Sequence, residues 1–390
     1  MGLCLNAARL LDVLTLGWVA LELTGSPLLV GVAAFCRAAP MMALGPLGGV
    51  LADRVPLGRL LLCAQVASLG AALVLAWLFR GGSGPYRGLL LLELVLGAAW
   101  AFDFTARRTA IFTLVGPGRL TNAVSLETVG MQMAKVLGPL AGGVLLARIG
   151  PVACYSALAI LYSTAVLLTC PLARRLTAGG RHTAAAGGPE PAPSAASAVA
   201  EIWRRGTIRG VLIITVCMNV LVFPYQQMLP VFARDVLHVG PALLGLMYAA
   251  DGLGSVLGAL ALASARGFAQ HTLVFAVGSL GAATVLLGFS LAPWYGAALA
   301  LLVLMGLAES GFATMQSAIV LLAAPDRLRG RAMGLLSACI GSGPLGALWL
   351  GFAATFLGAP AATALGAAAA LALMAPVATR LPALETQPPR

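Results

Sequence analysis

Six ionisable residues lie near the middle of long apolar stretches of this 390-residue sequence. They are Asp12, Arg37, Asp103, Lys135, Asp251 and Glu309. An ionisable side chain inside a bilayer is costly unless it is paired or hydrated, so such residues commonly have a function. A desolvated carboxyl group can bind a cation or exchange protons near neutral pH. The alternative is an internal ion pair that fixes helix packing, and the sequence leaves both interpretations open for Asp103 and Glu309.

Other charged residues bear on these candidates. Arg9 stands one helical turn before Asp12 and is close enough to neutralise it. Arg37 is expected to pair with an acid of its own half, with substrate contact as the alternative. Glu93 and Glu127 lie nearer the ends of their apolar stretches and are weaker candidates.

The elements that carry these residues are twelve apolar runs, each long enough to span a bilayer as a helix. The runs are 3–23, 27–51, 58–79, 88–114, 121–147, 151–172, 207–231, 240–265, 271–291, 294–323, 331–357 and 360–379. The predicted fold class is an all-α membrane protein with twelve transmembrane helices in two six-helix halves. The halves are residues 1–172 and 207–390. Between them, 173–206 is rich in Ala, Gly, Pro and Ser and is predicted to be a cytoplasmic linker that ends in a short interfacial helix.

Composition agrees with this class, because 60% of residues are hydrophobic and 9% are charged, against about 25% charged in a soluble protein. Of the 24 basic residues, 17 fall on one side of the predicted spans, four on the other and three within spans. The positive-inside rule then places both termini in the cytoplasm. This distribution accounts for the net charge of +11 without a nucleic-acid partner.

Enzymatic motifs are missing from the sequence. Lys135 is the single lysine and follows Ala134, so no GxxxxGK[ST] phosphate-binding loop is present. His182, His238 and His271 are isolated, and no GxSxG or HExxH motif occurs. The seven cysteines stand singly in apolar runs. We therefore expect neither an enzyme nor a cofactor or metal site.

The two halves share a glycine pattern. Gly45 and Gly49 recur as Gly254 and Gly258, each 209 residues later. Glycines four residues apart form a face on which another helix can approach closely. Such duplication is the building plan of many transporters.

Two motifs carry a family resemblance. ELTGSP at 22–27 followed by GGVLADR at 48–54 resembles the first outer loop, second helix and first inner loop of the major facilitator superfamily. The branch resembled is the bacterial drug and siderophore exporters related to macrolide efflux proteins. The resemblance implies that Gly49, Asp53, Arg54 and Arg59 form a cytoplasmic gate, although residues 56–58 depart from the usual loop pattern.

The resemblance also assigns residues to a cavity and to a contact between the halves. Helices 1, 4, 7 and 10 line the cavity in that fold. The predicted coupling and substrate residues are Asp12, Asp103, Glu309, Asn219, Gln226 and Arg37. Gly138, Pro139 and Gly142 match the GP-x-x-G core of a motif on helix 5 of antiporting exporters. Helices 5 and 8 adjoin there, and Lys135 and Asp251 lie at nearly the same depth on them, so we predict an ion pair that joins the halves.

The function implied is secondary active export of small amphipathic molecules, by proton antiport and alternating access. The partners are a small-molecule substrate, protons and the lipid bilayer, and the expected state is a monomer in the bacterial cytoplasmic membrane. An uncoupled facilitator, a lipid flippase of the same fold and a non-transporting receptor or assembly factor remain alternatives.

Overall fold

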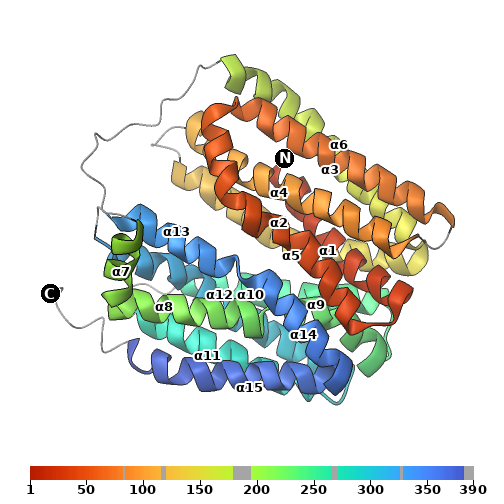
Figure 1. The fold of residues 1–390 in the computed structure, drawn as a ribbon. Helices are drawn as coiled ribbons and strands as arrows, with labels where there is room; N and C mark the ends of the chain where they lie inside the picture. The colour runs from red at the N-terminus through yellow and green to blue at the C-terminus, as the bar shows by residue number, and fades with distance from the viewer. Residues whose placement is uncertain (82–83, 116–119, 179–194, 265–270, 326–327, 382–390) are drawn as a thin grey trace. The chain divides into compact units, whose positions relative to one another are not determined.

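The computed structural model describes residues 1–81, 84–115, 120–178, 195–264, 271–325 and 328–381. For residues 45–54, 108–109, 111–115, 120–122, 124–125, 174–178 and 195–198 it describes the backbone alone. The described residues are almost entirely helical (Figure 1). They contain twelve helical spans that are long and apolar enough to cross a membrane, which confirms the predicted fold class and number of spans.

The first six spans are single helices. They are α1 (Gly2–Thr24), α2 (Pro27–Arg54), α3 (Leu57–Leu78), α4 (Tyr86–Val115), α5 (Leu120–Arg148) and α6 (Pro151–Ala178), with a 3₁₀ turn η1 (Phe79–Gly81) after α3. A short helix α7 (Ala195–Arg204) precedes the seventh span. Later uninterrupted spans are α10 (Pro241–Ser264), α11 (His271–Ser290), α12 (Tyr295–Ala323) and α15 (Ala359–Ala378).

The seventh and eleventh spans are interrupted, which the sequence analysis did not predict. The seventh consists of α8 (Gly206–Cys217), a π-helical turn η3 (Met218–Val222), α9 (Tyr225–Val231) and a second π-helical turn η4 (Phe232–Val236). Pro224 follows η3 and Pro230 lies inside α9, and each lacks the N–H group that a regular helix needs. The eleventh consists of α13 (Arg329–Ile340) and α14 (Gly343–Leu357), on either side of Gly341 and Ser342.

The chain forms two compact units, each described here by itself. Unit 1 comprises Met1–Gly187 and Leu229–Ala249, and unit 2 comprises Gly188–Met228 and Ala250–Arg390. In unit 1, α3 packs against α4 and α6, α2 packs against α4, and α1 packs against α5 and α6. In unit 2, α11 packs against α12 and α15, and α8 packs against α12, α13 and α15. The division into halves at 172 and 207 stays a prediction.

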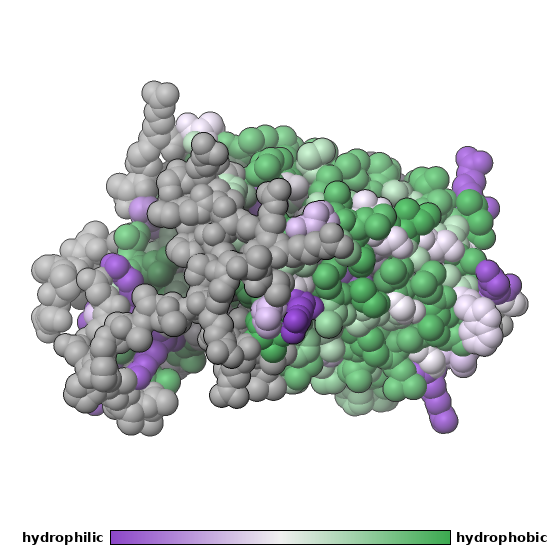
Figure 2. Space-filling view, turned by 90° about the horizontal axis from the view of Figure 1, so that it is seen from above, coloured by the Kyte–Doolittle hydropathy of each residue, from purple (hydrophilic) through white to green (hydrophobic). Residues whose placement is uncertain are grey.

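Large apolar side chains cover the outer faces of the spans. Trp77, Leu126, Leu167 and Phe356 are 65–73% exposed. Figure 2 shows apolar residues over most of the described part of one face, with polar residues gathered toward its ends. This pattern suits contact with lipid rather than with water. In α7, Ile202 is buried whereas Val199 and Trp203 are exposed, which is the amphipathic character expected of it.

Candidate functional site

Three helices of unit 1 bring two carboxylates and one guanidinium together. Asp12 comes from α1, Arg37 from α2 and Glu93 from α4. Arg37 Nε donates a hydrogen bond to Asp12 Oδ2 at 2.8 Å, and Glu93 Oε2 lies 3.3 Å from the same nitrogen. The side chains of both acids are 0% exposed and that of Arg37 is 8% exposed. We call these three residues the acid–arginine cluster.

A close approach of two helices positions this cluster. A Cβ atom on Gly97 of α4 would collide with the carbonyl oxygen of Arg37 on α2, so only glycine lets the two backbones come this near. Glu93 precedes Gly97 by four residues and therefore lies on the same face of α4. The contact at Gly97 thus sets the Glu93 carboxylate beside the Arg37 side chain.

The cluster is short of hydrogen-bond partners. Nε of an arginine carries one hydrogen, and here Asp12 accepts it. Within the described part of the chain, Glu93 Oε1 and Oε2, Asp12 Oδ1 and Arg37 Nη2 have no hydrogen-bond partner. One guanidinium therefore faces two acids and gives a full hydrogen bond to only one of them. Two ionised carboxylates would leave the cluster with a charge of −1.

The neighbouring groups come from α1, α2, α4 and α6. The guanidinium of Arg9 lies over the ring of Trp100, 4.7 Å from its centroid. Tyr155 and Tyr162 of α6 lie close enough to Asp12 and Glu93 to interact with them electrostatically. The described residues include no ion pair between Arg9 and Asp12, although the Arg9 guanidinium interacts electrostatically with the Asp12 carboxylate. Arg37 instead pairs with acids of its own half, which is the arrangement expected for it.

Glu93 lies deeper than its place in the apolar run 88–114 predicts. The helix begins at Tyr86, and the Glu93 side chain is fully buried. The signal that could have identified it is depth. Asp12 lies 12 residues from the helix end Thr24, Arg37 lies 10 residues from Pro27, and Glu93 lies 7 residues from Tyr86. All three helix ends lie on the same side of the predicted membrane.

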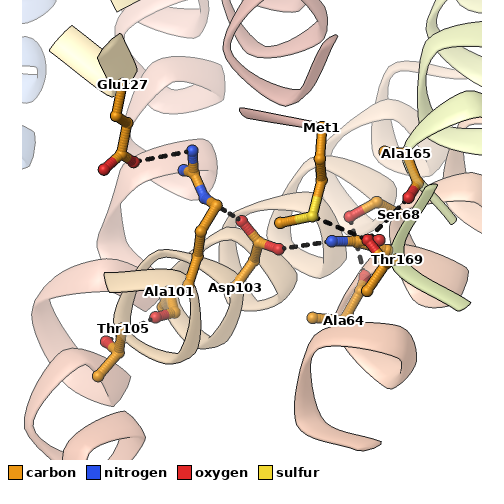
Figure 3. A network of polar contacts seen from close by, with 11 residues as sticks. Met1, Ala64, Ser68, Ala101, Asp103, Thr105, Glu127, Ala165 and Thr169 are labelled. Carbon is orange, nitrogen blue, oxygen red and sulfur yellow. Dashed lines mark hydrogen bonds and ion pairs between the residues drawn. The ribbon is translucent and has the colours of Figure 1, made fainter. Parts of the chain in front are cut away.

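Asp103, a predicted coupling residue, belongs to a second network (Figure 3). Gln65 Nε2 donates to Asp103 Oδ1 at 3.0 Å, and Arg107 Nε donates to Asp103 Oδ2 at 3.2 Å. Arg107 Nη1 also donates to Glu127 Oε1 at 3.1 Å. Both oxygens of Asp103 accept hydrogen bonds, and a cation lies one turn away. These contacts link α3, α4 and α5, and a role of Asp103 in proton exchange stays a prediction.

Unit 2 contains the predicted residue Glu309, on α12. Its side chain is buried, and Tyr225 Oη donates to Glu309 Oε1 at 3.4 Å. Asn219 in η3 donates to the backbone oxygen of Thr215 at 2.9 Å, so its amide is engaged in the helix. Gln226 is partly buried. The aromatic rings nearby are packed among themselves, with the centroids of Phe223 and Phe312 5.5 Å apart.

The predicted gate lies at the junction of α2 and α3. Asp53 and Arg54 are in the last turn of α2 rather than in a loop, since the connection is limited to Val55 and Pro56. The side chains of Asp53 and Arg54 and the surroundings of Gly49 lie outside the described part of the structure. Arg59 is exposed in the first turn of α3.

The small residues of α5 contact two partners within unit 1. A Cβ atom on Gly138 or Gly142 would lie 2.9 Å from Ala7 O and 3.0 Å from Leu11 Cγ, respectively, so this face packs on α1. That contact lies inside the N-terminal half and differs from the predicted one. Pro139 faces α10, because a Cβ atom on Gly245 would lie 2.6 Å from its carbonyl oxygen, and its predicted role in joining the halves stays a prediction. Gly143 meets Gly245 at the same contact.

The other predicted contact joins Lys135 and Asp251. Lys135 is partly buried on α5 in unit 1, and Asp251 is buried on α10 in unit 2. The pair stays a prediction.

Comparison with known proteins identifies the family. The sequence profile of the transmembrane secretion effectors, a branch of the major facilitator superfamily, matches residues 3–389. The chain belongs to this family. It is therefore a transporter rather than an enzyme. It is a multi-pass membrane protein of a family that binds small-molecule substrates.

Relatives and solved structures agree with this assignment. The multidrug efflux pump Tap of Mycolicibacterium fortuitum is 24% identical over 92% of this chain and 89% of its own length. The staphyloferrin A transporter of Staphylococcus aureus is 28% identical, over only 42% of this chain and 41% of that protein. A bacterial homologue of the human lysosomal transporter Spinster superposes over the whole of this chain, with a TM-score of 0.71 at 16% identity. The D323A mutant of the nucleoside transporter NupG superposes over 97% of this chain, with a TM-score of 0.74 at 12% identity. At these identities the two structures show the fold alone.

Proposed function

We propose that this protein is a secondary active transporter that exports small amphipathic molecules by proton antiport and alternating access. The observation that supports coupling most directly is the set of buried acids within the spans. Asp12, Glu93, Asp103 and Glu309 are each at most 5% exposed. Acids in this position are retained against a cost of several kcal/mol, which favours a role in moving charge. Export is supported by the similarity to efflux pumps over nearly the full length of the chain.

The substrate is proposed from these relatives. One relative is named as a multidrug efflux pump and another as a staphyloferrin A transporter, so both kinds of compound are candidates for this chain. No residue in the described spans selects between them. A test should therefore include an apolar cation such as ethidium and also staphyloferrin A.

The orientation proposed has both termini in the cytoplasm, as the distribution of arginines indicates. In that orientation the junction of α2 and α3 faces the cytoplasm, and Asp53 with Arg54 and Arg59 would form the gate. Asp53→Asn is expected to reduce transport strongly while leaving expression and membrane insertion unchanged. Transport at the unchanged rate by this variant would remove the case for a gate. A reporter fused to the C-terminus tests the orientation.

The decisive experiment uses inverted membrane vesicles from a host that lacks its own pumps. Acidifying the vesicle lumen should drive uptake of ethidium or staphyloferrin A against its gradient, and addition of the substrate should release protons from the lumen. The variants Asp103→Asn and Glu309→Gln, measured for substrate uptake and proton release in the same vesicles, then test whether either residue carries the proton.

The alternatives give different results in the same vesicles. An uncoupled facilitator would move the substrate only down its gradient. A flippase would instead move a fluorescent phospholipid between leaflets. A receptor or assembly factor would move none of these probes. Any of these outcomes would contradict proton-driven export.

A further inference from the structure

The acid–arginine cluster of Asp12, Arg37 and Glu93 has an unbalanced charge in a buried part of unit 1. Both acids are 0% exposed and share one cation. An uncompensated charge buried in a low dielectric costs several kcal/mol even after the protein relaxes. Binding one proton removes that cost, because Asp12⁻, Arg37⁺ and a neutral Glu93 add up to zero.

The hydrogen bonds indicate which acid holds the proton. Asp12 accepts the single Nε hydrogen of Arg37 and remains the ionised partner. Neither oxygen of Glu93 accepts a hydrogen bond from the described residues. A buried carboxylate without hydrogen bonds is the less stable anion of the two. We infer that Asp12 and Glu93 hold one exchangeable proton between them over Arg37, chiefly on Glu93, and that this cluster is the proton-exchange site of the transporter.

Within the described part of the chain, the other titratable groups around the cluster do not offer the same exchange. The neighbouring titratable side chains are Arg9, Cys36, Cys154, Tyr155 and Tyr162. In their ordinary ranges, arginine, cysteine and tyrosine keep their protons at neutral pH. Loss of the Glu93 proton converts Glu93–COOH into Glu93–COO⁻ and gives the cluster a charge of −1. Uptake of a proton from the opposite side restores neutrality, so one cycle carries one proton.

This inference rests on the proposed antiport and adds the residues that perform it. It also separates the two acids of the cluster from Asp103, whose carboxylate already accepts hydrogen bonds at both oxygens and has Arg107 beside it. The distinction is one of hydrogen bonds: both oxygens of Asp103 accept one, and among the described residues neither oxygen of Glu93 does.

Infrared difference spectroscopy of the purified protein in lipid tests the protonation directly. We expect a carbonyl band of a protonated carboxyl group at neutral pH that Glu93→Gln removes and Glu93→Asp shifts. Glu22→Gln is the matched control, because Glu22 is exposed at the end of α1 and makes its hydrogen bond with Trp18. The inference is overturned if the unchanged protein lacks such a band, or if the band persists unchanged in Glu93→Gln.

The vesicle assay then tests exchange, with ethidium and staphyloferrin A as probes. Glu93→Gln should lose at least tenfold in uphill uptake while exchange of labelled for unlabelled substrate persists. If the unchanged protein moves substrate without protons, the proposed antiport fails. If the unchanged protein moves protons and Glu93→Gln does so equally well, this inference alone fails.

Discussion

Among the described residues, Arg37 is the one cation in hydrogen-bond contact with Asp12, so its removal isolates the energetics of the acid–arginine cluster. Arg37→Met keeps an unbranched apolar stem and removes the guanidinium. Asp12 then loses a hydrogen bond of 2.8 Å while remaining fully buried. The folded variant is expected to hold Asp12 as a neutral acid, and hence one more proton than the unchanged protein holds.

The size of the effect follows from proton linkage. In the unfolded chain an aspartate ionises with a pKa of about 3.9. Keeping it protonated at pH 7 costs about 1.4 kcal/mol for each pH unit above that value, or about 4 kcal/mol. Removing one partner of a buried ion pair typically costs about 3–5 kcal/mol, which agrees. Because the folded variant binds the extra proton, its deficit grows as pH rises and falls to about 2 kcal/mol at about pH 5.5.

The assay is reversible unfolding in mixed detergent micelles at several pH values, followed by circular dichroism. Arg37→Met combined with Asp12→Asn should recover most of the loss, because no buried charge is then left unpaired. Arg59→Met is the control and should change the free energy of unfolding by less than about 0.5 kcal/mol, since Arg59 is exposed. A loss below about 1 kcal/mol, or a loss that does not change with pH, would refute the reasoning.

Substitutions at three further contacts between helices test the packing. Gly97→Leu should prevent α2 and α4 from packing and lower the yield of monodisperse protein in size-exclusion chromatography, whereas Gly70→Leu, with open space around it, should not. Gly245→Leu should lower the temperature up to which the protein stays monodisperse in size-exclusion chromatography, because its side chain would meet the Pro139 oxygen. Unchanged thermal stability would contradict the contact. Lys135→Ala and Asp251→Ala should each impair folding or transport, and exchanging the two residues should restore much of the loss if they form the predicted pair.

The spans could be predicted because the hydropathy pattern that marks each of them extends over a long stretch of residues and recurs along the chain. The run predicted at 27–51 became α2 over Pro27–Arg54, and the run at 360–379 became α15 over Ala359–Ala378. A stretch of about 20 apolar residues has few alternatives to a helix in lipid, since every backbone N–H and C=O group must be bonded within the segment. Hydropathy alone therefore sets the number and the approximate ends of the helices.

The partners of the buried charges were harder to predict because they depend on helix rotation and depth. Asp12 has Arg9 one turn away in the sequence, yet it pairs with Arg37 from another helix. Spacing in the sequence favours Arg9 as the partner of Asp12, whereas the packing of α1 against α2 brings Arg37 to it. The π-helical turn η3 also escaped prediction, because a single extra residue in a turn leaves almost no trace in an apolar pattern.

Internal duplication could have supplied the missing information. Gly97 recurs as Gly306, 209 residues later, which is the same offset that relates Gly45 to Gly254. Both glycines bring an α-helix against the span two before it, with Gly97 at the backbone of Arg37 and Gly306 at that of Asp251. Each also has a buried glutamate within one turn, Glu93 before Gly97 and Glu309 after Gly306. A glycine that recurs in both halves thus marks a close approach of two spans with a buried acid beside it, and that pattern would have placed Glu93 among the candidates beside Glu309.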